Sequence, residues 1–242
     1  MERLRLNAVQ HHIFDSLYHG SRWALLEEFL KRNAKIYVLA GALRDAIAAL
    51  YEGRGDGLPR DFDIGIAGIQ KEDFKDVLAA FGVRNRHGGF VLREQKMPTW
   101  DVWRLEDSIG LRKTGSVFTI ENVLRSFNLD SNAIALEVKT GVFTDAGAIK
   151  SIRRMEAGFV ESAIRHSPTT FAAKALLIQL RFGYSVSVPM ERFIKRHLEK
   201  DTLLYESRKI FPALSVVPAD NSLIRGLERV GWPSFAFCRQ PF

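Results

Sequence analysis

Apolar side chains recur along the chain at two different spacings, and the change from one spacing to the other predicts its elements. Apolar residues three or four positions apart are typical of surface helices. This spacing covers residues 7–19, 21–32, 43–52 and 72–81. Short runs rich in β-branched and aromatic residues predict strands. Such runs cover residues 35–40, 61–67, 89–93, 100–105, 116–120, 133–138 and 142–145.

Beyond residue 147 the pattern is helical only. Helices are predicted over residues 169–182, 189–204 and 221–230. We therefore expect an α+β domain over residues 1–150, followed by a small all-α domain over residues 151–242.

Composition narrows the class of protein. Of the 242 residues, 46% are apolar and 26% are charged, which is typical of a folded domain and excludes a disordered chain or a collagen. Cys238 is the only cysteine, which excludes an intrachain disulfide and a cysteine-rich zinc site. The N-terminal segment is too polar for a signal peptide, and no stretch approaches the about 18 apolar residues of a spanning helix. We expect a cytoplasmic protein that does not bind a membrane.

The net charge of +7 is unevenly distributed. Residues 1–150 hold 21 Lys and Arg against 20 Asp and Glu, whereas residues 151–242 hold 14 against 8. A basic C-terminal part is typical of proteins that meet a polyanion such as RNA. A solvated helix face is the alternative for the candidate RNA-binding residues, which share helix faces: Lys174, Arg181, Arg192, Lys195, Arg196 and Lys200.

A glycine turn follows the predicted strand 35–40. It has the sequence Gly41-Ala42-Leu43-Arg44-Asp45 and leads into a helix. Glycine lets the backbone approach a ligand closely, and a helix N-terminus favours phosphate. Arg44 could bind phosphate as well, or it could close the turn through a contact with Asp45.

Three aspartates are candidate metal ligands. Asp61 and Asp63 alternate with Phe62 along a strand, so both carboxylates project from the same face. Neighbouring carboxylates repel unless a cation lies between them, and Mg²⁺ prefers such oxygen ligands. Asp101 lies on a later strand between large apolar residues. Polar strand ends facing water, or a salt bridge from Asp101 to Arg104, are the alternatives.

Taken together, these segments favour nucleotidyl transfer from a nucleoside triphosphate. That chemistry needs two Mg²⁺ ions and correct positioning of the reactants. Asp61 and Asp63 would hold both ions, Asp101 would complete the shell of the ion that activates the incoming hydroxyl, and the Gly41 turn would hold the triphosphate.

The segments resemble the polymerase-β-like nucleotidyltransferases, specifically the head and neck of bacterial poly(A) polymerases and CCA-adding tRNA nucleotidyltransferases. The family's Gly-Gly-x-x-Arg-Asp turn is matched by Gly41, Arg44 and Asp45, with Ala42 in place of the second glycine. Asp61 and Asp63 match its Asp-x-Asp strand, and Asp101 matches its third carboxylate. The resemblance covers roughly residues 30–185. It implies an α+β head with a mixed sheet and flanking helices, two Mg²⁺ ions as cofactors, a nucleoside triphosphate substrate and an RNA 3′ end as acceptor.

A later segment follows the family in outline only. The pattern Arg-Arg-Asp-Phe-Thr-Ile-Asn-Ala is matched at Asn132 and Ala133, whereas its Arg-Arg-Asp falls on Ser126, Phe127 and Asn128. Arg125 is displaced by one position. The resemblance makes six residues candidate nucleotide ligands: Gly41, Ala42, Arg44, Asp45, Arg125 and Asn132. Asn132 and Asp145 also suit structural roles in a turn and a helix cap.

The sequence is compatible with three functions. The first is a metal-dependent nucleotidyltransferase acting on RNA, which the basic C-terminal part favours. The second is the same chemistry on a small molecule or a protein, because a long tRNA-binding body is not expected after residue 185. The third is a non-catalytic relative that binds nucleotide or RNA, which the altered Arg-Arg-Asp segment favours and the three aspartates oppose.

Overall fold

The computed structural model describes residues 2–18, 22–53, 59, 61–85, 88–94, 97–160, 178 and 183–197. The chain forms two compact units. One comprises Met1–Arg154 and Phe159–Ile164, and the other comprises Met155–Gly158 and Arg165–Phe242. Within the described ranges, no helix combines the length and the apolar character needed to cross a bilayer.

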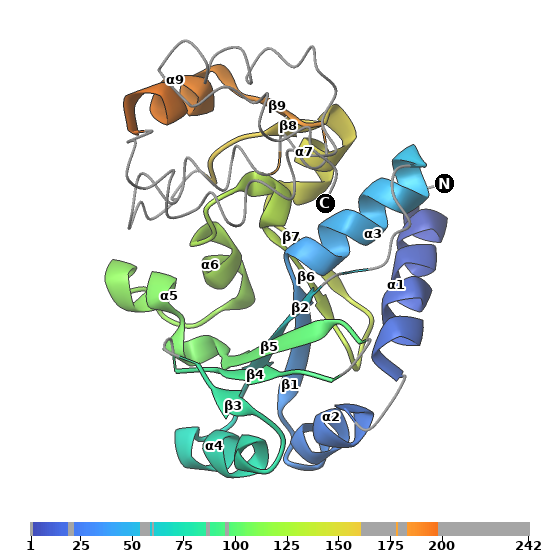
Figure 1. Ribbon diagram of the computed structural model, residues 1–242, viewed down its shortest axis with the longest axis vertical. Helices are drawn as coiled ribbons and strands as arrows, with labels where there is room; N and C mark the ends of the chain where they lie inside the picture. The colour runs from blue at the N-terminus through green and yellow to red at the C-terminus, as the bar shows by residue number, and fades with distance from the viewer. Residues whose placement is uncertain are drawn as a thin grey trace, which may run out of the picture. The chain divides into compact units, whose positions relative to one another are not determined.

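The first unit is built on a mixed sheet of seven strands in the order β3-β4-β5-β2-β1-β6-β7 (Figure 1). Strands β2 and β5 are parallel, and the other neighbouring pairs are antiparallel. The strands are β1 (Lys35–Leu39), β2 (Asp61–Ala67), β3 (Val83–Arg84), β4 (Phe90–Leu92), β5 (Thr99–Arg104), β6 (Ile134–Glu137) and β7 (Phe143–Asp145).

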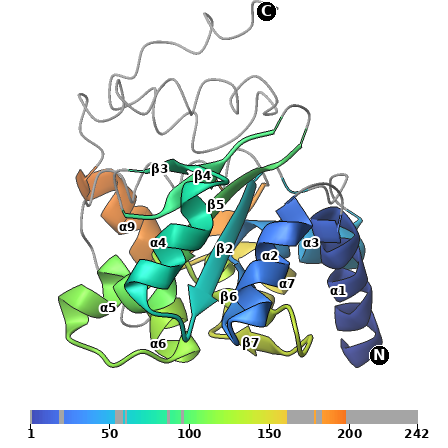
Figure 2. The ribbon, with the colours of Figure 1, turned by 90° about the horizontal axis from the view of Figure 1, so that it is seen from below.

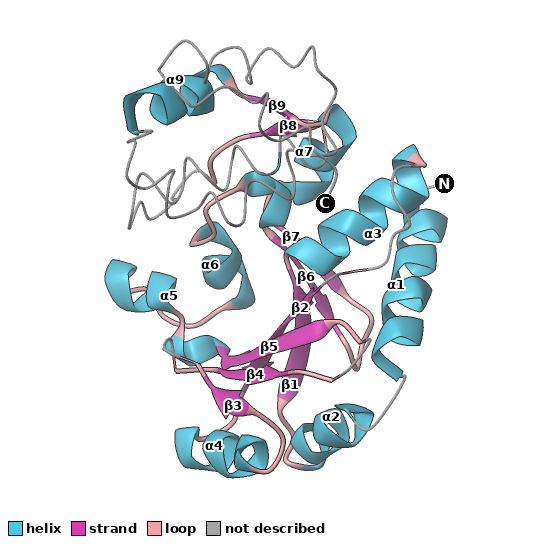
Figure 3. Cartoon of the chain, in the orientation of Figure 1, coloured by secondary structure: helices cyan, strands magenta, loops and turns pink. Residues whose placement is uncertain are grey.

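Helices flank this sheet on its faces (Figures 2 and 3). They are α1 (Glu2–Tyr18), α2 (Arg22–Lys31), α3 (Gly41–Glu52), α4 (Lys71–Ala79), α5 (Ile109–Thr114), α6 (Ile120–Arg125) and α7 (Ala148–Arg154), with the short 3-10 helices η1 (Leu105–Asp107) and η2 (Asp130–Asn132).

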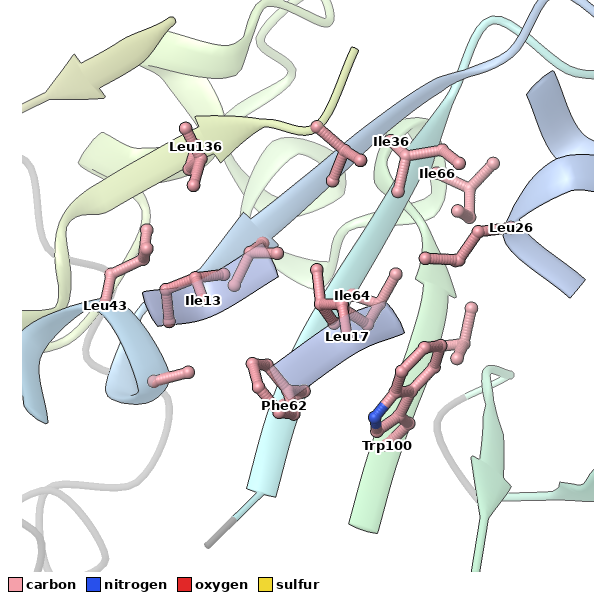
Figure 4. Close-up of a cluster of buried hydrophobic side chains, with 14 of the residues drawn as sticks. Ile13, Leu17, Leu26, Ile36, Leu43, Phe62, Ile64, Ile66, Trp100 and Leu136 are labelled. Carbon is pink, nitrogen blue, oxygen red and sulfur yellow. The ribbon is translucent and has the colours of Figure 1, made fainter. Parts of the chain in front are cut away.

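The larger core lies on the face to which the even-numbered residues of β2 point. Phe62, Ile64 and Ile66 are completely buried there. Trp100 of β5 packs edge-on against Phe62, with ring centroids 6.2 Å apart. Helices α1, α2, α3, α4 and α7 supply the side chains that cover this face, and Figure 4 shows several of them. Because side chains alternate along a strand, the odd-numbered residues of β2 belong to the other face.

That other face carries a smaller core. Leu105 of η1 and side chains of α5 and α6 pack against Leu39 of β1 and its neighbours. Gly65 leaves no room for a side chain, because an added Cβ would lie 2.4 Å from Leu105 Cδ2 and 2.9 Å from Leu39 Cδ1. This core therefore covers β2 from Gly65 onward, whereas Asp61 at the start of the strand is exposed.

In the second unit the structure describes β8 (Glu156–Ala157), β9 (Ser185–Val186) and α9 (Val188–His197). Strands β8 and β9 form a parallel pair, so the expectation of an all-α C-terminal region is wrong in this detail. The predicted helix over 189–204 is present from Val188 to His197. Its remainder, the predicted helix over 221–230 and all but Ile178 of the predicted helix over 169–182 lie outside the described residues.

Most predicted elements of the first unit are confirmed, and the strand over residues 61–67 has the predicted bounds. The predicted strand over residues 116–120 is wrong. Gly115 ends α5 in a left-handed conformation with φ 64°. The side chain of Thr119 then accepts a hydrogen bond from the backbone N–H of Asn122 at 3.1 Å and begins α6. The helix cap outweighs the β propensity of Val117 and Thr119.

Candidate active site

The sheet topology brings the three predicted segments to one end of the sheet. Strand β1 is antiparallel to β2 and ends with Leu39 opposite Asp63, so the glycine turn lies beside the start of β2. On the other side of β2, the parallel strand β5 places Asp101 opposite Asp63. The carboxylate strand β2 therefore lies between the glycine turn and the third aspartate.

The three aspartates lie on the face that carries the smaller core. They occupy odd-numbered positions in the paired strands β2 and β5, opposite to the buried Phe62 and Trp100. Asp61 is exposed, and Asp63 and Asp101 are half-buried. Among the described residues, the smaller core around Leu105 includes none of the three aspartates.

The carboxylate oxygens of the three aspartates are the type of ligand that a hard cation binds. Carboxylates at directly paired positions of neighbouring strands are close enough to share one ion, and Mg²⁺ prefers oxygen ligands. In the described part of the chain, however, no three His, Cys, Asp or Glu side chains are arranged to hold a metal ion together. One oxygen of Asp101 also has a protein partner, because Oδ1 accepts a hydrogen bond from Nδ2 of Asn85 at 2.8 Å.

The turn between β1 and α3 corrects the match to the family pattern. With Arg44 as the arginine of Gly-Gly-x-x-Arg-Asp, the two glycines fall on positions 40 and 41, so the residue that departs from the pattern is Ala40 and not Ala42. Ala40 has φ 54° and ψ −115°, a conformation that suits glycine far better than alanine. The side chain of Ala42 packs in the larger core, so only its backbone could contact a nucleotide.

Arg44 is buried and bonded within the protein. Its Nε and Nη2 donate to Oδ1 of Asp45 at 2.9 and 2.7 Å, which confirms the predicted contact between neighbours. Its Nη1 donates to Oδ1 of Asn132 at 2.6 Å. These three candidate nucleotide ligands therefore form one cluster that joins the start of α3 to η2. Their contact with a nucleotide stays a prediction.

The remaining candidates occupy different places. Arg125 is exposed at the end of α6. Oδ1 of Asp145 accepts hydrogen bonds from the backbone N–H groups of Gly147, Ala148 and Ile149, which confirms its predicted role as a helix cap.

The predicted RNA-binding residues are described only in part. Arg192 and Arg196 are exposed on α9, and Lys195 lies between them on the same helix. Lys174, Arg181 and Lys200 lie outside the described residues.

Two residues that contact β5 or the residues just before it carry no signal in the sequence: Asn85 on the side of the aspartates and Arg22 on the side of Trp100. Asn85 contacts Asp101 as described above. Arg22 is buried beneath the start of β5, where it donates to the carbonyl of Pro98, pairs with Glu94 at 3.2 Å and lies over the Trp100 ring. Burial lowers the pKa of the Arg22 guanidinium, and Glu94 opposes this shift. Both contacts are long-range, so no local pattern could have predicted them.

Comparison with known proteins gives a likeness in structure only. No protein-family model matches the sequence, and a search of the curated proteins finds no match. The Thermotoga maritima CCA-adding enzyme complexed with tRNA matches 90% of this chain and 52% of its own, with 17% identity and a TM-score of 0.62. A CCA-adding enzyme with CTP matches 86% of this chain and 48% of its own, with 18% identity and a TM-score of 0.58.

A CCA-adding enzyme with ATP matches 90% of this chain and 51% of its own, with 16% identity and a TM-score of 0.58. The chain thus spans about half the length of these enzymes. At such identities the likeness shows the fold alone, and it confirms the predicted α+β class and the predicted resemblance in fold to CCA-adding enzymes.

Proposed function

We propose that this protein is a metal-dependent nucleotidyltransferase. It has the fold of the CCA-adding enzymes, and a glycine turn and three aspartates lie at one end of its sheet. The observation that carries the proposal is the register of β2 and β5, in which Asp63 lies opposite Asp101 beside the turn at Gly41. Two half-buried carboxylates at paired positions favour a cation between them.

In the proposed reaction the acceptor hydroxyl oxygen forms a bond to the α-phosphorus of a nucleoside triphosphate. The bond from that phosphorus to the bridging oxygen breaks, pyrophosphate leaves and the hydroxyl proton passes to solvent. Asp61, Asp63 and Asp101 would hold Mg²⁺. When bound, Mg²⁺ would activate the hydroxyl and stabilise negative charge on the triphosphate.

The chain's own groups position the reactants. The backbone at Gly41 is open, since an added Cβ would meet only Nη2 of Arg44, at 3.7 Å. The first N–H groups of α3 point out of the helix start and favour the phosphates. We infer that Arg44 stabilises this helix start through Asp45 and Asn132.

RNA is the acceptor that we propose. The part of the chain after residue 150 has 14 Lys and Arg against 8 Asp and Glu, which favours a polyanion. In addition, one structural relative is complexed with tRNA. A small molecule or a protein as the acceptor is an outcome of the test.

A specific observation favours a second candidate, a relative that binds nucleotide without transferring it. Ser126 stands where the family has the first arginine of Arg-Arg-Asp. It packs so closely against Gly110 that a Cβ there would lie 2.1 Å from Oγ of Ser126. Its hydroxyl donates to the carbonyl of Val123 at 2.7 Å. In this chain the position therefore serves the packing of α5 against α6.

The test incubates the protein with Mg²⁺, total RNA and each labelled nucleoside triphosphate in turn. Label in RNA supports the proposal, and label only in protein or small molecules changes the acceptor. Asp61→Ala and Asp63→Ala should each lower transfer at least 100-fold, because each removes a ligand of the metal on which the reaction depends. Asp76→Ala, at an exposed position of α4, is the control. Full activity in the Asp63→Ala variant would refute the metal assignment.

A further inference from the structure

Asn85 links the edge of the sheet to the third aspartate. It follows β3 directly, in the hairpin that connects β3 to β4, and β4 pairs with β5 so that Val91 lies opposite Asp101. The side-chain Nδ2 of Asn85 donates to Oδ1 of Asp101 at 2.8 Å. The two residues are 16 positions apart, so this bond exists only when the hairpin folds back onto β5.

The orientation of the Asn85 amide is determined by its other partners. Its Oδ1 accepts a hydrogen bond from the backbone N–H of Gly89 at 3.0 Å. Its backbone N–H donates to the carbonyl of Gly89 at 2.8 Å. Since the amide oxygen faces an N–H donor, the amide nitrogen has to face the carboxylate. The hairpin therefore presents a donor, and not an acceptor, to Asp101.

Two glycines allow this close approach. Gly88 has φ 90°, which side chains rarely allow. At Gly89 an added Cβ would lie 2.7 Å from the carbonyl oxygen of Val102 and 3.2 Å from Nδ2 of Asn85. Any larger residue at position 89 would push the hairpin away from β5, and the bond from Asn85 to Asp101 would lengthen.

We propose that Asn85 is a positioning residue for the proposed nucleotidyl transfer. Its hydrogen bond restricts the rotation of the Asp101 carboxylate by occupying Oδ1, so that Oδ2 is the oxygen that a cation shared with Asp63 would take. This inference rests on the proposed function, because only a metal-binding Asp101 needs such positioning. In this role Asn85 would act through Asp101, without itself binding substrate or metal.

Asn85→Asp separates positioning from folding. The aspartate keeps an oxygen that accepts from the Gly89 N–H, so the hairpin is retained, but it replaces the donor to Asp101 by a second carboxylate that repels the first. Asn85→Ala removes both bonds. Arg84→Gln is the matched control, because it lowers the net charge by the same one unit at the exposed neighbouring position, whose side chain lies on the opposite face of the hairpin from Asp101.

We expect kcat to fall at least tenfold in both Asn85 variants, as the loss of a hydrogen bond to a charged group implies. The KM for the nucleoside triphosphate should change less than about twofold, since the glycine turn is a separate element. The dissociation constant for Mn²⁺, measured by electron paramagnetic resonance without nucleotide, should rise in Asn85→Ala. Arg84→Gln should match the unmodified protein, and Asn85→Asp should unfold at a similar temperature because its bond to the Gly89 N–H is retained.

A direct readout needs no activity. The side-chain amide resonances of Asn85, assigned by their loss in Asn85→Ala, should shift in an Asp101→Ala variant because their acceptor is gone. Unshifted resonances, or an Asn85→Asp variant with unchanged kcat and Mn²⁺ affinity, would overturn the positioning role. If the unmodified protein neither transfers nucleotide nor binds Mn²⁺ while the resonances do shift, the proposed function fails, and Asn85 is then only a structural residue of the hairpin.

Discussion

Replacing Gly41 by alanine should separate the stability of the fold from nucleotide binding. An added Cβ would meet only Nη2 of Arg44, at 3.7 Å, which is an ordinary van der Waals distance. Gly41 also has no positive φ and begins a helix, where alanine is the better residue. We therefore expect the free energy of unfolding to change by less than about 0.5 kcal/mol.

The same Gly41→Ala substitution should weaken nucleotide binding strongly. If the phosphates lie against the backbone of the turn, a methyl group at position 41 displaces them from one N–H donor. The loss of a hydrogen bond to a charged group costs about 1.5–3 kcal/mol, or about 10–150-fold in the dissociation constant. Isothermal titration calorimetry with each nucleoside triphosphate measures this without an acceptor.

Gly65→Ala is the structural counterpart. Its Cβ would lie 2.4 Å from Leu105 Cδ2, so it should destabilise the fold by about 1–3 kcal/mol through overpacking. An unchanged affinity for every nucleoside triphosphate in Gly41→Ala would refute the glycine turn as the phosphate site. A Gly41→Ala variant that unfolds as readily as Gly65→Ala would contradict the geometry of the turn.

Two further predictions concern buried polar groups. Asn132→Ala removes the 2.6 Å hydrogen bond from the buried Arg44, so it should destabilise the protein by about 1.5–3 kcal/mol in urea unfolding; Asn132→Asp retains the acceptor and should lose much less, and equal losses would exclude this bond as the cause. Burial, with Glu137 and Glu121 nearby, raises the pKa of Tyr37 above 10.0. Above pH 10.0 the unfolded chain therefore loses a proton that the folded chain keeps, and stability falls. Tyr37→Phe should weaken this alkaline loss in thermal unfolding between about pH 9 and 11, and an identical pH profile would contradict the argument.

The sequence predicts the central strands well because their signals are local. The strand over residues 61–67 alternates two aspartates with Phe62 and Ile64, and that alternation alone indicates which face is buried. Helices α5 and α6 escape prediction because six residues make fewer than two turns and show no periodicity. Between them, β-branched residues imitate a strand until Thr119 caps α6.

The residues of the candidate site, too, can be predicted from the sequence only in part. Asp61, Asp63, Asp101 and the turn at Gly41 can be found by residue type and spacing. The side chains around them cannot, because Asn85 bonds Asp101, Asn132 bonds Arg44, and Arg22 bonds the Pro98 carbonyl before β5, each far away in the sequence. The departure at Ala40 follows from the spacing to Arg44, but its strained φ of 54° is known only from the structure.

The single parallel pair in an otherwise antiparallel sheet explains why the site forms where it does. In an antiparallel neighbour, the residue opposite Asp63 would come from the far end of a strand, as Leu39 does on β1. The parallel β5 instead begins beside the beginning of β2, so Asp101 follows Thr99 at the same distance from the strand start as Asp63 follows Asp61. Both strands therefore begin at the same end of the sheet, and among the described residues the core around Leu105 does not include the aspartates at that end. A one-residue slip in this register would turn Asp101 into the larger core and Trp100 out of it. Packing of Trp100 between Phe62 and Arg22 opposes that slip, so the buried face of β5 specifies the position of the aspartate on its other face.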